Sequence, residues 1–85
     1  MSEPFPPLPN IEDLIDGAGQ ITIGAIQPVQ CAAVALYESR PLTMLVRRDG
    51  ESFVHFLTRL DTAIDLAHEE EIFIDEINNG PNDRL

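Results

Sequence analysis

The sequence has no lysine and no tryptophan, and it has a single cysteine, Cys31. A single cysteine excludes a disulfide bridge within the chain and a structural zinc site built on several thiolates. No apolar run approaches the ~18 residues of a membrane-spanning helix, and the first residues have neither the basic nor the apolar region of a signal peptide. These absences predict a cytoplasmic protein without a membrane segment.

Positive charge is scarce as well. The 85 residues include 15 acidic residues and only five basic ones, all arginine, which gives a formal net charge of −10. Residues 1–60 have a net charge of −3, and residues 61–85 have a net charge of −7. A chain of this charge is repelled by a phosphate backbone and by anionic lipid. We therefore expect no direct binding to nucleic acid or to a membrane, and a basic protein as the partner.

Proline is concentrated near the N-terminus, where EPFPPLPN (residues 3–10) holds four prolines. We predict that residues 1–19 form an extended Pro-rich arm, with a possible short helical turn between Asn10 as a cap and Gly17 as a stop. The P-x-x-P spacing also fits the aromatic grooves that bind Pro-rich peptides, but a spacer role is favoured. At the other end, residues 79–85 are predicted to form a frayed acidic tail.

Residues 20–78 predict one α+β domain. Three strands are predicted at residues 20–26, 30–37 and 42–48, although the alanine content of residues 29–38 also fits a helix. Apolar residues then recur at helical spacing from Phe53 to Ala67, which predicts an amphipathic helix over about 52–69 with Ser52 as its cap. Residues 71–77 predict a last strand. The order β-β-β-α-β indicates a mostly antiparallel sheet with the helix packed on one face.

The second predicted strand is apolar on both faces, because Ala33 and Ala35 alternate with Ala32, Val34 and Leu36. One helix covers only one face of a sheet, and folding of so short a chain buries only about 60% of its unfolded surface. We expect the uncovered face to meet a second subunit or the N-terminal arm. The protein is therefore predicted to be a homodimer built on its sheet.

The order of elements is similar to that of a known family. The β-β-β-α-β order, with DGESFVHFL (residues 49–57) at the start of the helix, resembles the small HicB-type antitoxin domains. The resemblance is one of topology, because the glycine-containing turns usual between the early strands of that family are not matched here. It implies an antitoxin-like protein as an alternative function.

Groups suited to catalysis or metal binding are few. Cys31 lies in an apolar run, where a thiol is usually an inert core group. Asp65, His68 and Glu69 have a spacing that can hold a metal on one helix, but His55, the other histidine, falls on the opposite flank. Carboxylate pairs on the helix surface are not accompanied by any sign of a cleft. We therefore predict no enzyme activity, no metal and no cofactor, with a small enzyme as the second alternative.

The remaining feature is the run of acidic residues in the last third of the chain. On a helical wheel Asp61 and Asp65 fall on one flank of the predicted helix and Glu69 on its outer face, so Asp61→Ala is expected to be neutral or slightly stabilising. Acids four residues apart, or at the C-terminal end of a helix, are unfavourable for stability, so they serve either solubility or a partner. The predicted partner-binding residues are Asp61, Asp65, Glu69, Glu70, Glu71, Asp75 and Glu76. We expect a non-enzymatic interaction or regulatory protein, with a nucleic-acid-mimicking inhibitor as the alternative.

Overall fold

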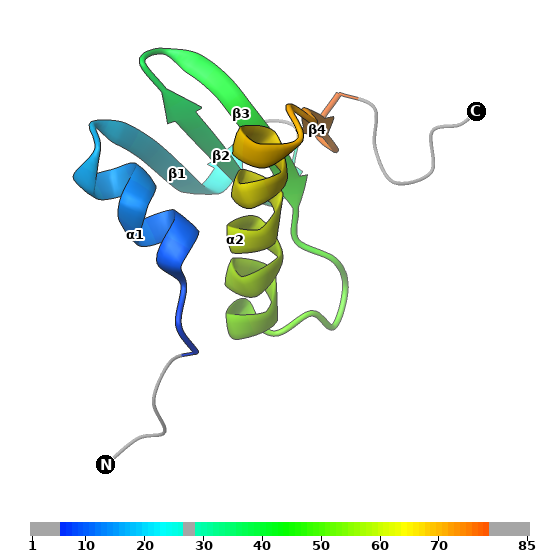
Figure 1. Ribbon diagram of the computed structural model, residues 1–85. Coiled ribbons are helices and arrows are strands. Elements are labelled where there is room, and N and C mark those ends of the chain that lie inside the picture. The colour runs from blue at the N-terminus through cyan, green and yellow to red at the C-terminus, as the bar shows by residue number, and fades with distance from the viewer. Residues whose placement is uncertain (1–5, 27–28, 79–85) are drawn as a thin grey trace.

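A computed structural model describes residues 6–26 and 29–78 of the chain. The elements are α1 (Pro9–Asp16), β1 (Gly19–Ile26), β2 (Val29–Tyr37), β3 (Arg40–Val46), α2 (Phe53–Glu69) and β4 (Ile74–Asp75) (Figure 1). The predicted α+β class and the order β-β-β-α-β are confirmed, and residues 29–37 are a strand. The predictions for residues 1–5 and for the acidic tail at residues 79–85 lie outside the described residues.

The four strands form one mixed sheet in the order β1-β2-β3-β4. β1, β2 and β3 pair antiparallel, and β4 joins β3 in parallel. The β2–β3 hairpin turns at Glu38 and Ser39, which both have positive φ angles (52° and 69°), as a two-residue turn that follows the right-handed twist of its strands requires. The sheet therefore has two different edges, the eight residues of β1 and the two residues of β4.

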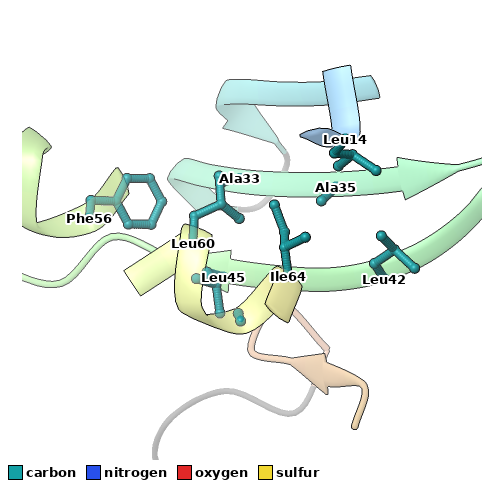
Figure 2. Close-up of a cluster of buried hydrophobic side chains, with 9 residues drawn as sticks. Leu14, Ala33, Ala35, Leu42, Leu45, Phe56, Leu60 and Ile64 are labelled. Carbon is teal, nitrogen blue, oxygen red and sulfur yellow. The ribbon is translucent and has the colours of Figure 1, made fainter. Parts of the chain in front are cut away.

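Helix α2 supplies the largest part of the core, as its apolar spacing predicts, except that Phe53 at its start is 42% exposed. Ser52 caps the helix, because its Oγ accepts the N–H of His55 at 3.0 Å. One stripe of α2 packs against the inner face of β2 and β3 (Figure 2). The core contains Phe56, Leu60, Ala63 and Ile64 from α2, Ala33, Ala35, Leu42 and Leu45 from the sheet, and Leu14 from α1.

The short helical turn predicted after the proline-rich stretch is a complete helix, α1. It begins at Pro9, a residue favoured in the first turn of a helix, and Gly17 follows its end. Asn10 lies inside the first turn and is not the cap. Leu14 is buried in the same core as α2, so residues 9–16 pack with the domain instead of extending away from it.

The last strand is shorter than the predicted residues 71–77, and this part of the prediction is wrong. The chain must reverse after α2, and it does so through Glu70 in a helical conformation and Glu71 at a φ of 57°. Neither conformation belongs to a strand. β4 also ends early, because the side chain of Asp75 accepts the main-chain N–H of Asn78 at 2.9 Å and forms a turn. Of the predicted strand residues 71–77, only Ile74 and Asp75 pair with β3.

The face of the sheet away from the helices is apolar, as the sequence of β2 predicts. Val34 pairs with Met44 and Ala32 pairs with Val46, so these four side chains share that face. The three larger ones are half-buried, and Ala32 is fully buried. Both helices of the described chain contribute to the core on the opposite face.

Candidate functional site

Three consecutive glutamates occupy the reversal between α2 and β4. Glu69 ends the helix, and Glu70 and Glu71 form the turn. Two main-chain bonds fix this turn, because Leu66 O accepts the N–H of Glu70 at 2.9 Å and the N–H of Ile72 at 3.2 Å. All three glutamates are exposed. We call Glu69, Glu70 and Glu71 the acidic corner.

Two large apolar side chains follow the acidic corner directly. Ile72 and Phe73 were predicted to lie in a strand, but their exposed fractions are 45% and 51%. They line one side of an open hollow of about 430 Å³ at this end of the molecule. The hollow is lined by Arg40, Pro41, Leu42, Ala67, His68, Glu71, Ile72 and Phe73. Negative charge and exposed apolar surface therefore lie side by side.

Asp65 and His68 lie close to the acidic corner along α2. Asp65 is half-buried one helical turn before Glu69, and His68 is exposed. The His68 ring meets Tyr37 of β2 edge to face, with 6.4 Å between the ring centroids. This contact holds His68 at the end of the sheet. No group of three or more histidine, cysteine or acidic side chains within residues 6–26 and 29–78 is arranged to hold a metal ion.

Asp61 has a different position from the one the helical wheel predicts, and its expected exposure is wrong. Its exposed fraction is only 8%. Asp61 Oδ1 accepts the main-chain N–H of Asn10 at 2.8 Å and of Ile11 at 2.9 Å, and Oδ2 accepts from Asn10 Nδ2 at 3.0 Å. The first N–H groups of a helix have no partner within the helix. Asp61 therefore caps α1 from the neighbouring helix.

Asp75 and Glu76 are engaged within the protein as well. Asp75 accepts from the main chain and the side chain of Asn78. Glu76 accepts the N–H of Val46 at 2.9 Å and forms ion pairs with Arg48 and Arg59, both at 3.3 Å. The predicted set of seven acids is therefore not one surface. The structure brings Asp65 and the acidic corner together and places the other three in internal contacts.

Glu51 is the centre of a second cluster, which sequence reasoning missed. Its side chain is only 4% exposed, and it accepts from Arg59 Nε at 2.7 Å, from Arg59 Nη2 at 3.0 Å and from the main-chain N–H of Arg48 at 3.0 Å. The ring of His55 also contacts it at 2.6 Å. Arg59 holds the pKa of Glu51 at about 2, well below its usual 4.5, mainly through its hydrogen bonds.

Arg59 connects this cluster to the sheet. Its Nη2 donates to Val46 O at 2.8 Å as well as to Glu51, and its Nη1 donates to Glu76. The hydrogen bonds that Arg59 donates to Glu51 raise the pKa of Arg59. One guanidinium therefore links the loop before α2, the end of β3 and the residue after β4. The only local signal in the sequence is an acid just before the helix cap in an arginine-rich stretch.

Comparison of this chain with family models, with curated proteins and with solved structures gave no match. Among the helices of the described chain, none combines the length and the apolar character that crossing a membrane requires.

Proposed function

We propose that this protein is a non-enzymatic interaction protein that binds a basic protein partner through the acidic corner and acts as a homodimer built on its sheet. The observation that carries the proposal is the difference between the acidic residues. Asp61, Asp75 and Glu76 have internal partners, whereas the three glutamates of the corner are exposed at a turn fixed by main-chain bonds. Negative charge is therefore presented to the solvent in a defined geometry.

The stability of the fold does not explain why three glutamates and two exposed apolar residues lie at this turn. Acids near the C-terminal end of a helix face its negative dipole and cost roughly 0.3–1 kcal/mol each. Glu71 adds an unfavourable backbone, because its φ of 57° is rarely adopted by a residue with a side chain. Exposed Ile72 and Phe73 also forgo the free energy of burial. Unfavourable charges, an unfavourable backbone conformation and exposed apolar side chains at one corner are together typical of a surface retained for binding.

The surface also defines the chemistry of the partner. A basic segment would face the glutamates, and an apolar side chain next to it would contact Phe73 and enter the hollow beside it. Charge of this kind chiefly accelerates association and gives salt dependence, while the apolar contact slows dissociation. We therefore expect binding that weakens as ionic strength rises but keeps an apolar contribution.

The test is affinity capture from nuclease-treated extract with a charge-reversed corner, Glu69, Glu70 and Glu71 all changed to lysine. A matched control changes three other exposed acids to lysine, Asp13, Asp16 and Glu38, so that both variants have the same net charge. The proposal expects the corner variant to lose the captured partner and the control to keep it. Equal capture by both folded variants would show that the corner only solubilises the protein.

A nucleic-acid mimic is the alternative, favoured by the net charge of −10. A mimic would occupy the site on its partner protein that normally binds DNA or RNA. Adding duplex or single-stranded nucleic acid to the captured complex separates the two functions. A mimic is displaced by the competitor, whereas a partner bound through an ordinary basic surface segment remains.

A further inference from the structure

We infer that two copies of the chain associate through the open edge of β1, pairing antiparallel about a twofold axis at Thr22 to form one continuous sheet of eight strands. The inference rests on the homodimer proposed above but not on the acidic corner. It places the interface at a strand edge, whereas the apolar face of the sheet was the sequence-based expectation.

The two edges of the sheet are protected very differently. β4 is two residues long, contains Asp75 and ends in a turn. β1 is eight residues long, GQITIGAI, with no charged residue and no proline. Natural sheets protect a long edge with charge, proline, a bulge or a covering element, because its open main-chain groups pair with other strands. β1 has one irregularity, a register shift between Gly24 and Ile26 near the end of the strand. In a chain that is 24% charged, a fully uncharged edge strand indicates that this edge has a partner.

The backbone register shows which groups are available. Arg47 donates its N–H to Cys31 O at 3.0 Å. The main-chain N–H and C=O groups of the odd-numbered residues of β2 therefore point towards β3, and those of the even-numbered residues point towards β1. Their partners in β1, such as Thr22, face back to β2. The N–H and C=O groups of Ile21 and Ile23 therefore point outward, and among the described residues β1 pairs with β2 alone.

The three central residues of β1, Ile21, Thr22 and Ile23, read the same in both directions about Thr22, and this local symmetry favours a second copy as the occupant. In an antiparallel pair with Thr22 opposite its own copy, Ile21 stands opposite the second copy's Ile23, and the reverse holds across the axis. Each isoleucine pair exchanges two main-chain hydrogen bonds. Isoleucine opposite isoleucine and threonine opposite threonine are both favourable cross-strand pairs. An isologous contact of this kind closes as a dimer and leaves no further edge of the same type.

Electrostatics and exposure favour the same edge. Two copies with a net charge of −10 each repel, and β1 itself brings no charge into the contact, although α1 beside it has exposed acids at Glu12, Asp13 and Asp16. Exposed large apolar residues also occur here, with Ile23 at 37% and Ile15 of the adjacent α1 at 49%. Val34, Met44 and Val46 on the apolar face are only half-buried, and none is among the exposed large apolar residues. Apolar surface is therefore open to burial at this edge.

Light scattering at micromolar concentration tests the assembly. The wild-type protein should give a particle mass of twice the 9.4 kDa of one chain. Ile23→Lys places a charge at the edge on the helix side and should give a folded monomer, whereas Met44→Lys, on the apolar face, should stay dimeric. A monomeric wild type overturns the edge dimer and leaves the acidic corner to the capture experiment. A dimeric Ile23→Lys with a monomeric Met44→Lys overturns it in favour of the face.

If Ile23→Lys fails to fold, the exposed Thr22 gives a second test. Thr22→Lys and Thr22→Glu should each be monomeric, because like charges meet at the axis, and an equimolar mixture should recover the dimer mass. Cross-linking fixes the register in a Cys31→Ala background. Thr22→Cys should form a disulfide dimer on mild oxidation, because directly opposed non-hydrogen-bonded residues have Cα atoms about 4.5 Å apart. Gln20→Cys should form no disulfide dimer, because residue 20 stands opposite residue 24 of the second copy. A disulfide from Gln20→Cys and none from Thr22→Cys would overturn the pairing.

Discussion

Asp61 on α2 and Asn10 on α1 lie 51 positions apart in the sequence, yet the Asp61 carboxylate accepts both the main-chain N–H and the side-chain amide of Asn10. The same carboxylate accepts the N–H of Ile11. An acid at the N-terminus of a helix satisfies free N–H groups and faces the positive end of the helix dipole. This contact fixes α1 against α2 and completes the core around Leu14.

The first prediction is that Asp61→Ala destabilises the protein by about 1–3 kcal/mol, because it leaves two helix N–H groups without an acceptor. This replaces the neutral or slightly stabilising effect that the helical wheel predicts. Urea unfolding followed by circular dichroism measures the change. Asp65→Ala, one turn further along α2 and half-buried with no hydrogen bond to α1, is the control and should change stability by less than about 0.5 kcal/mol. Similar small effects of both changes would contradict the capping role.

The second prediction concerns the coupling between Glu51 and Arg59. Both side chains are largely buried and joined by two hydrogen bonds, so removing either charge weakens the pairing of the buried charge that remains. Glu51→Gln, Arg59→Met and the double variant should give a coupling energy of about 1–3 kcal/mol in a double-mutant cycle. The pair Arg48 and Glu76 is the comparison. Because Arg48 is 53% exposed, its coupling should stay below about 1 kcal/mol.

The third prediction is a pH dependence that follows from the low pKa of Glu51. A carboxyl group whose pKa is lower in the folded than in the unfolded state stabilises the fold above its unfolded pKa and loses this effect as the pH falls through the folded pKa. For Glu51 the loss runs from about pH 4.5 to about pH 2. The lowering corresponds to at most about 3 kcal/mol, and partial exposure of the neighbouring side chains reduces this to about 1–2 kcal/mol.

The measurement is the free energy of unfolding of the wild type and of Glu51→Gln between pH 7 and pH 2. The wild type should be more stable at neutral pH, and the difference between the two proteins should shrink below about pH 4.5. A difference that stays constant down to pH 2 would mean that Glu51 is not held ionised by Arg59.

The elements of this fold were predictable because their signals are local. The stripe that buries Leu60 and Ile64 depends on spacings of three and four residues, and the strand character of residues 29–37 depends on alternation and neighbouring turns. The exposed position of Glu69 and Glu70 also follows from their place at the end of the predicted helix. Each of these inferences needs only a short window of sequence.

The contacts that were missed depend on segments far apart in the chain. Nothing near Asp61 indicates that the start of another helix will lie against it, because the wheel describes α2 alone. Glu76 was assigned to a partner surface for the same reason, since Arg59 and Val46 reach it only after β4 has paired with β3. The length of β4 was overestimated because a strand parallel to β3 can begin only after the chain has reversed its direction at the end of α2. The number of residues in that reversal is not visible in the sequence.

The last prediction concerns Glu71, where stability and binding should change in opposite directions. Its φ of 57° costs a residue with a side chain roughly 1 kcal/mol relative to glycine, and glycine adopts this conformation freely. Glu71→Gly should therefore raise the free energy of unfolding by about 0.5–1 kcal/mol, helped by the loss of repulsion within the acidic corner. Glu70→Gly is the matched control, because Glu70 has helical backbone angles and glycine there should destabilise by about 0.5–1 kcal/mol. If the corner binds a basic partner, Glu71→Gly should also weaken capture, since it removes a charge and loosens the turn before Phe73. A variant that is more stable and still captures the partner at wild-type strength and salt dependence would show that Glu71 is not part of the binding surface.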